Sequence, residues 1–188
     1  MNKKLDFGRI CLLAFPLVIL VPGASHAEEF KGPYVAVEGG IGVLKTDGTT
    51  LGGPVDEAEN SGLLSGVLGY RSPVGANGRL VLGAEGIFGF YTSGTNLHYG
   101  VYGIGGYRVG DKGLAYLRVG YGGLKDVQTG TGNSLDGPVF GGGYEFSIHE
   151  KANLRLDYRY LSYGDVNIPD NTLDFSGHEI TAGLLFNF

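Results

Sequence analysis

From Tyr34 onward, hydrophobic and polar residues alternate with a period of two in segments of about ten residues. In the first segment Val35, Val37 and Ile41 share one face, and Glu38 lies on the other. A period of two indicates β-strands, because successive side chains point to opposite faces of a sheet. Glycine interrupts nearly every stretch that could form an amphipathic helix. The pattern predicts eight strands, at Tyr34–Val43, Ser61–Arg71, Leu80–Phe90, Leu97–Val109, Leu114–Leu124, Val139–Ile148, Asn153–Tyr163 and Gly177–Phe188.

The predicted connections between these strands alternate in length. The long ones are Lys45–Asn60, Tyr91–Asn96, Lys125–Asp136 and Gly164–Ser176, and the mostly shorter ones are Ser72–Gly78, Gly110–Gly113 and His149–Ala152. In bacterial transmembrane barrels the long loops face outside and the short turns face the periplasm. Both ends of the strand series would lie at the short-turn end. We therefore predict an all-β fold: an eight-stranded antiparallel up-and-down transmembrane β-barrel.

An internal repeat supports this arrangement. Tyr70, Tyr107 and Tyr144 each follow a glycine near the end of a predicted strand, and 37 residues separate each from the next. Each repeat would be one hairpin that carries an aromatic residue on the same face and at the same end. On the outside of a barrel such residues form an aromatic girdle at the membrane interface.

The charged residues of the strands fall on the face opposite the apolar one. A basic residue in contact with lipid at the bilayer midplane costs about 2–4 kcal/mol, so this face should point into the barrel. Leu114, Ile104 and Leu185 also fall on this face, which favours a packed plug over an open pore. A soluble lipocalin-like barrel is the alternative, but it would need an apolar interior. The predicted interior ion-pair network consists of Glu38, Arg71, Glu85, Arg108, Arg118, Glu145, Arg155, Asp157, Arg159 and Glu179.

Residues 1–27 differ from the rest of the chain. Basic residues at Lys3, Lys4 and Arg9 precede the apolar stretch Ile10–Val21, and small residues stand before Glu28. This pattern predicts a cleaved signal peptide, with an N-terminal membrane anchor as the alternative. We accordingly predict a barrel domain over 28–188, without cysteine and without a transmembrane helix. The cleavage removes three basic residues and one acidic residue and changes the net charge from −5 to −7, which argues against nucleic-acid binding.

Several segments resemble the small outer-membrane porin family with the OmpA-like, or opacity-protein-like, transmembrane barrel. The resemblance covers essentially all of 28–188. Its segments are the opening strand YVAVEGG at 34–40, the GYR triplets at 69–71 and 106–108, the strand LRLDYRY at 154–160 and the closing strand HEITAGLLFNF at 178–188.

The closing strand resembles the family's C-terminal β-signal, with apolar residues at Ile180, Leu184, Phe186 and the terminal Phe188. The resemblance implies assembly by the barrel assembly machinery of a Gram-negative outer membrane. It also implies contact with outer-membrane lipid and lipopolysaccharide. The loops are a possible contact with a host or phage surface.

The polar residues give little indication of catalysis or metal binding. A hydrolase would need a Ser-His-acid arrangement, and His98, His149 and His178 lack a suitably placed serine. The acidic residues Asp47, Asp56, Glu57, Glu59, Asp165, Asp170 and Asp174 could attract a divalent cation, although solvated acidic loops explain them as well. We expect no catalytic, cofactor-binding or metal site.

Two classes of function remain open from the sequence. The first is a structural or weakly conducting barrel in the envelope, and the second is an adhesin or receptor that acts through its loops. A lipid A-modifying enzyme is a further alternative, because such enzymes also occur on eight-stranded barrels.

Overall fold

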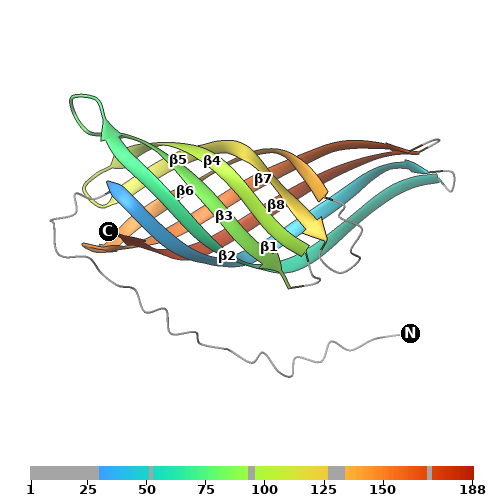
Figure 1. Cartoon of the computed structure of the whole chain (residues 1–188), viewed down its shortest axis with the longest axis horizontal. Coiled ribbons are helices and arrows are strands. Elements are labelled where there is room, and N and C mark those ends of the chain that lie inside the picture. The colour runs from blue at the N-terminus through green and yellow to red at the C-terminus, as the bar shows by residue number, and fades with distance from the viewer. Residues whose placement is uncertain (1–29, 51–52, 93–95, 127–133, 169–170) are drawn as a thin grey trace, which may run out of the picture.

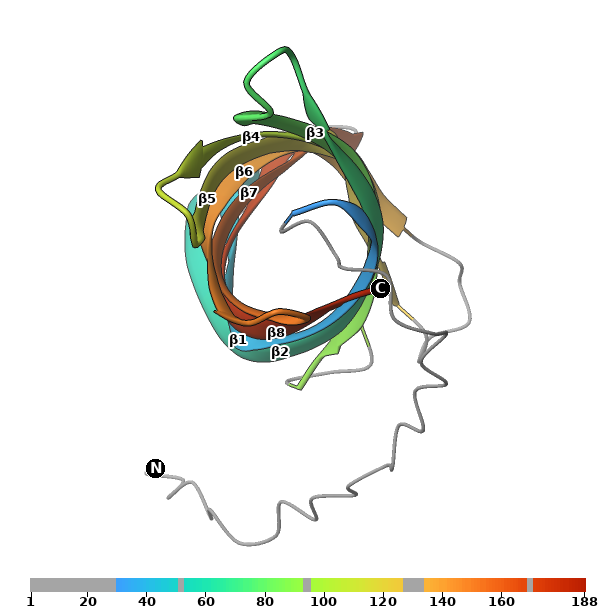
Figure 2. The ribbon, with the colours of Figure 1, turned by 90° about the vertical axis from the view of Figure 1, so that its left-hand side faces the viewer.

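The computed structural model describes residues 30–50, 53–92, 96–126, 134–168 and 171–188. The predicted signal peptide, 1–27, lies outside these residues. Eight antiparallel strands form a closed barrel in chain order, with the first strand paired to the last (Figure 1, Figure 2). They are β1 Gly32–Thr50, β2 Gly53–Val74, β3 Leu80–Tyr91, β4 Asn96–Val109, β5 Gly113–Asp126, β6 Ser134–His149, β7 Ala152–Ile168 and β8 Asn171–Asn187. The predicted fold class is confirmed.

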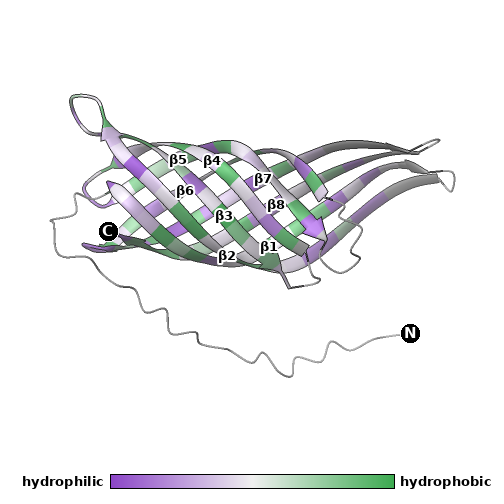
Figure 3. Cartoon of the chain, viewed as in Figure 1, coloured by the Kyte–Doolittle hydropathy of each residue, from purple (hydrophilic) through white to green (hydrophobic). Residues whose placement is uncertain are grey.

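Side-chain burial alternates along the strands as the sequence pattern predicts. Leu68 and Leu117 are 67% and 73% exposed, whereas their strand neighbours Val67 and Arg118 are buried. Hydrophobic and hydrophilic residues alternate along the strands of the barrel body in Figure 3. A soluble barrel would turn these side chains inward, so the outward arrangement is that of a barrel surrounded by lipid. In the described part of the chain, no helix has the length and apolar character needed to cross a membrane.

The short turns and the repeated tyrosines lie at one end of the barrel, the short-turn end. Tyr70, Tyr107 and Tyr144 are exposed on the outer face. Each lies near this end of its strand, paired with a residue of the neighbouring strand. Gly75 and Gly110, in two of the turns, have φ of 80° and 64°, a conformation that favours glycine. Figure 2 views this end and shows the beginning of β1 bending across the barrel mouth.

At the opposite, long-loop end, two segments predicted as loops are largely strand. The β1–β2 ladder continues to Thr50↔Gly53, and the β7–β8 ladder continues to Ile168↔Asn171. Pairing of β1 with β8 joins both hairpins into one four-stranded sheet that extends past the other strands (Figure 1). We call residues 44–50, 53–62, 164–168 and 171–177 the protruding sheet. Predicting loops at 45–60 and 164–176 was therefore wrong, because hydrogen bonds between backbones continue where the alternation of side chains stops.

Candidate functional site in the barrel interior

The structure places most of the predicted network residues inside the barrel. Nine of the ten are buried there, on seven strands: Glu38, Arg71, Glu85, Arg118, Glu145, Arg155, Asp157, Arg159 and Glu179. The exception is Arg108, which is only half-buried near the short-turn end. Its guanidinium lies over the ring of Phe30, 5.7 Å from the ring centroid. Alternation gives the face of a residue but not its depth, and Arg108 lies beside a turn.

Arg155 on β7 links carboxylates from three other strands. Its Nη1 lies 3.3 Å from Glu38 Oε1, and its Nη2 lies 2.6 Å from Glu85 Oε1 and 2.7 Å from Glu145 Oε1. All four side chains have no exposed area. Since β1, β3 and β6 supply the acids, this one guanidinium ties together strands on different sides of the barrel.

Arg71 carries the network toward the short-turn end. Its Nη1 donates to Glu145 Oε2 at 2.6 Å, and its Nη2 donates to Asn187 Oδ1 at 2.8 Å. Its guanidinium also lies 4.6 Å from the ring centroid of Tyr34 and 5.1 Å from that of Phe30. These aromatic faces give the buried cation favourable electrostatic contacts besides the ion pair.

Arg159 carries the network toward the long-loop end. Its Nη2 lies 2.8 Å from Glu38 Oε2, and its Nε lies 3.2 Å from both Asp157 Oδ1 and Glu179 Oε2. The same Nη2 donates to the hydroxyl of Thr181 at 2.9 Å. Three acids from three strands therefore surround a second buried guanidinium.

Arg118 on β5 connects the acids of the two sides. Its Nη2 lies 2.8 Å from Asp157 Oδ2 and 3.2 Å from Glu85 Oε2. The rings of Tyr102 and Tyr116 flank it at 5.4 and 5.5 Å from centroid to guanidinium. With this residue, the buried ion pairs form one continuous network.

Tyrosine hydroxyls donate hydrogen bonds to three of the five buried carboxylates, a role not predicted from the sequence. Tyr34 donates to Glu85, Tyr116 donates to Asp157, and Tyr91 donates to Glu179. Such bonds offset part of the desolvation of buried charges. Tyr34 and Tyr116 share the strand parity of Glu38 and Arg118, so the same rule that identified the charges could have identified them.

His98 lies at the long-loop end of this network. The interior holds five buried carboxylates and four buried arginines, and His98 is a further buried base. Its Nδ1 lies 3.8 Å from Glu179 Oε1, and its ring packs 6.1 Å from that of Tyr91. Strand alternation places His98 on the inward face, opposite to its neighbours Leu97 and Tyr99.

Apolar side chains cover the ionic layer at both ends. Phe30, Val81 and Leu114 pack together at the short-turn end. Near the long-loop end, the buried residues Leu124, Val139, Leu161 and Tyr163 are covered by partly buried residues of the rim and the protruding sheet: Leu44, Tyr91, Leu135 and Phe175. The predicted inward positions of Leu114, Ile104 and Leu185 are confirmed by their burial. Apolar side chains thus pack against the ionic network on the sides of both barrel ends.

Comparison with protein families gives the context for this barrel. The family model for the outer membrane protein beta-barrel domain matches residues 11–188. The chain belongs to this family. Membership places the barrel in the outer membrane, so its exposed apolar face contacts lipid. A search of curated proteins finds no match.

A solved structure of low sequence identity shows the same fold. The crystal structure of Neisserial surface protein A aligns with a TM-score of 0.53 at 15% identity, over 84% of this chain and 98% of that one. OprG from Pseudomonas aeruginosa aligns with a TM-score of 0.48 at 12% identity, over 84% of this chain and 97% of that one. A de novo designed transmembrane barrel gives 0.47 at 15% identity, over 85% and 98%.

The other polar residues considered in the sequence lie outside the ionic layer. His178 faces outward and shares a 2.9 Å hydrogen bond with the hydroxyl of Tyr158, and His149 lies at the end of β6 beside a turn. Asp47, Asp56 and Asp174 are exposed on the protruding sheet, and Asp170 lies outside the described residues. Among the residues that the structure describes, no three His, Cys, Asp or Glu are grouped so as to hold a metal ion.

Proposed function

We propose that this outer-membrane barrel has a structural, non-catalytic role in the envelope, as a closed barrel that carries the protruding sheet above the membrane. The observation that carries the proposal is the position of Arg155. Its fully buried guanidinium sits between Glu38, Glu85 and Glu145, where an ion pathway along the barrel axis would have to pass. The apolar side chains on both sides of the network support the same conclusion.

The conductance of the purified protein in planar bilayers tests this proposal. We expect the wild-type barrel to show no steady current above that of the lipid alone. Glu85→Ala removes a carboxylate that pairs with both Arg118 and Arg155, so it should destabilise the barrel or open a leak. Arg79→Ala, at an exposed turn, is the matched control and should behave as wild type. A steady ohmic current through the wild-type protein would instead favour a weak pore.

We also propose that the two ends of the chain direct its export and its assembly into the membrane. Residues 1–27 act as the signal peptide, and the barrel assembly machinery reads the C-terminal strand. Ile180 and Leu184 are exposed on the outer face, and Phe186 and Phe188 are half-buried in line with them. Phe188→Ser should lower the amount of folded barrel in outer-membrane fractions, while a substitution at the exposed turn residue Lys112 should not. Equal yields for both variants would argue against this role of Phe188.

A second candidate function is an interaction through the protruding sheet with a host or phage surface. The observation that favours it is the pair of edges of this sheet: β2 residues 53–61 pair only with β1, and β7 residues 164–168 pair only with β8. An edge strand of this kind can accept a strand from another protein. Replacing residues 45–58 by Asn-Gly would remove one hairpin and should abolish binding of the bacteria to host cells or of phage to the bacteria. Unchanged binding would exclude this hairpin as the contact.

A further inference from the structure

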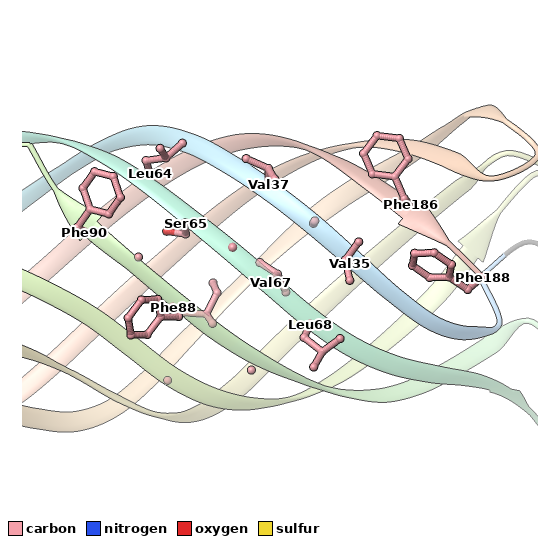
Figure 4. Close-up of a pocket in the computed structure, with 16 residues that line it drawn as sticks. Val35, Val37, Leu64, Ser65, Val67, Leu68, Phe88, Phe90, Phe186 and Phe188 are labelled. Carbon is pink, nitrogen blue, oxygen red and sulfur yellow. The ribbon is translucent and has the colours of Figure 1, made fainter. Parts of the chain in front are cut away.

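A groove crosses the lipid-facing surface of the barrel. It has a volume of about 870 Å³ and is lined by residues of β1, β2, β3, β4 and the end of the chain. Figure 4 shows Phe88 and Phe90 at one end and Phe186 and Phe188 at the other, with aliphatic residues of β1 and β2 between them. The groove thus has aromatic walls at both ends and an aliphatic middle.

The groove extends from one end of the barrel toward the other. Phe188 follows β8 at the short-turn end, and Phe90 precedes the last residue of β3 at the long-loop end. Strand pairing connects the intervening residues, since Val35 lies opposite both Phe186 and Leu68, and Leu68 lies opposite Gly86. A groove of this course lies within the membrane-embedded part of the barrel, where the hydrocarbon chains of the lipid meet its surface.

Two glycines form the floor of the groove, and the chain itself gives no steric reason for them. A Cβ at Gly66 or Gly86 would lie 3.9 or 4.0 Å from the nearest atom, in ordinary contact distance. By contrast, a Cβ at the inward-facing Gly40 or Gly120 would lie 2.0 or 2.1 Å from a carbonyl oxygen of the next strand. Glycine weakens a strand interior and often marks a close approach by another molecule. The open space above Gly66 and Gly86 is therefore space for something outside the chain.

We propose that an acyl chain of a membrane phospholipid lies in this groove. The outer face of an outer-membrane barrel meets hydrocarbon, and no charged side chain lines the groove. Without a Cβ at positions 66 and 86, the methylene groups of the chain contact the strands directly between the rings of Phe88 and Phe186. A bound chain of this kind stays with the barrel longer than the lipids around the rest of its surface.

Photolabelling with a phospholipid that carries a diazirine on one acyl chain tests the proposal. The full-length barrel is folded into vesicles containing this lipid, irradiated and digested, and the labelled peptides are mapped by mass spectrometry. We expect label on Leu64–Leu68 and Phe88–Phe90 to exceed that on the outer face of β5, Leu117–Tyr121, several-fold. Gly66→Leu and Gly86→Leu fill the groove and should each remove this excess.

Gly103→Leu is the matched control. Gly103 also faces outward, and a Cβ there would lie 3.8 Å from the nearest atom, but it does not line the groove. This variant should keep the labelling pattern of the wild type. The shift between unboiled and boiled samples on a gel shows that each variant is folded, and Gly66→Ala provides a smaller filling group if a leucine variant fails to fold.

Two results would overturn the proposal. The first is equal labelling around the barrel, or an excess that survives filling in the folded variants. The second is evidence that another copy of the chain, and not a lipid, occupies the groove. The predicted barrel domain contains no cysteine, so Gly66→Cys introduces a single thiol. Disulfide dimers at high yield in dilute vesicles would show that another copy covers the groove, whereas we expect the protein to stay monomeric in this assay.

Discussion

Arg155 forms ion pairs with three carboxylates from other strands, so replacing it should destabilise the barrel. Arg155→Met keeps much of the side-chain volume but removes one positive charge from the buried network, so Glu38, Glu85 and Glu145 each keep only one arginine partner. Removing one partner of a buried ion pair costs about 3–5 kcal/mol, so the free energy of unfolding should fall by roughly this amount. Urea unfolding from lipid vesicles measures the change. Arg79→Met, in an exposed turn, should leave the unfolding midpoint unchanged, and an equal loss in both variants would contradict the assigned role of Arg155.

Glycines on the two faces of the barrel should respond oppositely to alanine. At Gly40 a methyl group would lie 2.0 Å from Ile180 O and 2.7 Å from Thr181 Cα, so the strands must separate. We expect Gly40→Ala to lower the free energy of unfolding by about 1–3 kcal/mol, as overpacking does elsewhere. Gly66→Ala has room, and it should raise this free energy by about 0.5–1 kcal/mol because alanine loses less entropy on folding. The same urea titration measures both, and a loss of stability at Gly66 would contradict the open space seen above it.

At the level of single residues, alternation was sufficient to predict which charges face inward. Glu38, Glu85 and Arg155 could be placed from parity because the lipid face excludes charge. Parity could not place Phe30, which precedes the first strand and reaches the interior through a backbone φ of 63°. Nor could it give the partners of a charge, because the pairs join strands that are distant in sequence, such as Arg155 on β7 and Glu38 on β1. Those pairs depend on closure of the barrel.

Among the elements, the strands in the membrane were predictable and the protruding sheet was not. Lipid on one side and a charged interior on the other impose alternation within the barrel body. Above the membrane both faces of the sheet meet polar surroundings, so residues such as Asp47, Glu57 and Glu59 resemble a loop in the sequence. The register established within the barrel carries these residues into the same ladders, since Leu44↔Glu59 directly follows Val43↔Asn60.

The protruding sheet contains a row of acidic residues that should weaken it. Asp47 on β1 lies directly opposite Asp56 on β2 and Asp174 on β8. Like charges opposite each other are unfavourable by about 0.2–1 kcal/mol per pair. We therefore expect Asp47→Asn to slow amide hydrogen exchange in residues 44–48 at low salt, and the effect should shrink at high salt as screening weakens the repulsion. Thr46→Asn, on the opposite face, is the control. Faster exchange in Asp47→Asn would show that the carboxylate stabilises the sheet.

At the scale of the whole molecule, the strand pairs that close the ring lie outside the protruding sheet. Within the membrane β1 pairs with both β2 and β8, and the ionic layer joins seven strands below the level of Leu44. Replacing residues 45–58 by Asn-Gly connects Leu44 to Glu59, which already pair, through a favoured two-residue turn. We expect this variant to keep the shift between unboiled and boiled samples on a gel, because the ring and its ion pairs remain. Deletion of β8 is the contrasting variant. It opens the ring and removes Glu179, an ion-pair partner of Arg159, so it should abolish the shift. Loss of the shift in the shortened variant would mean that the protruding sheet helps to close the barrel, and the division of the molecule into a structural ring and a separable outer sheet would then be wrong.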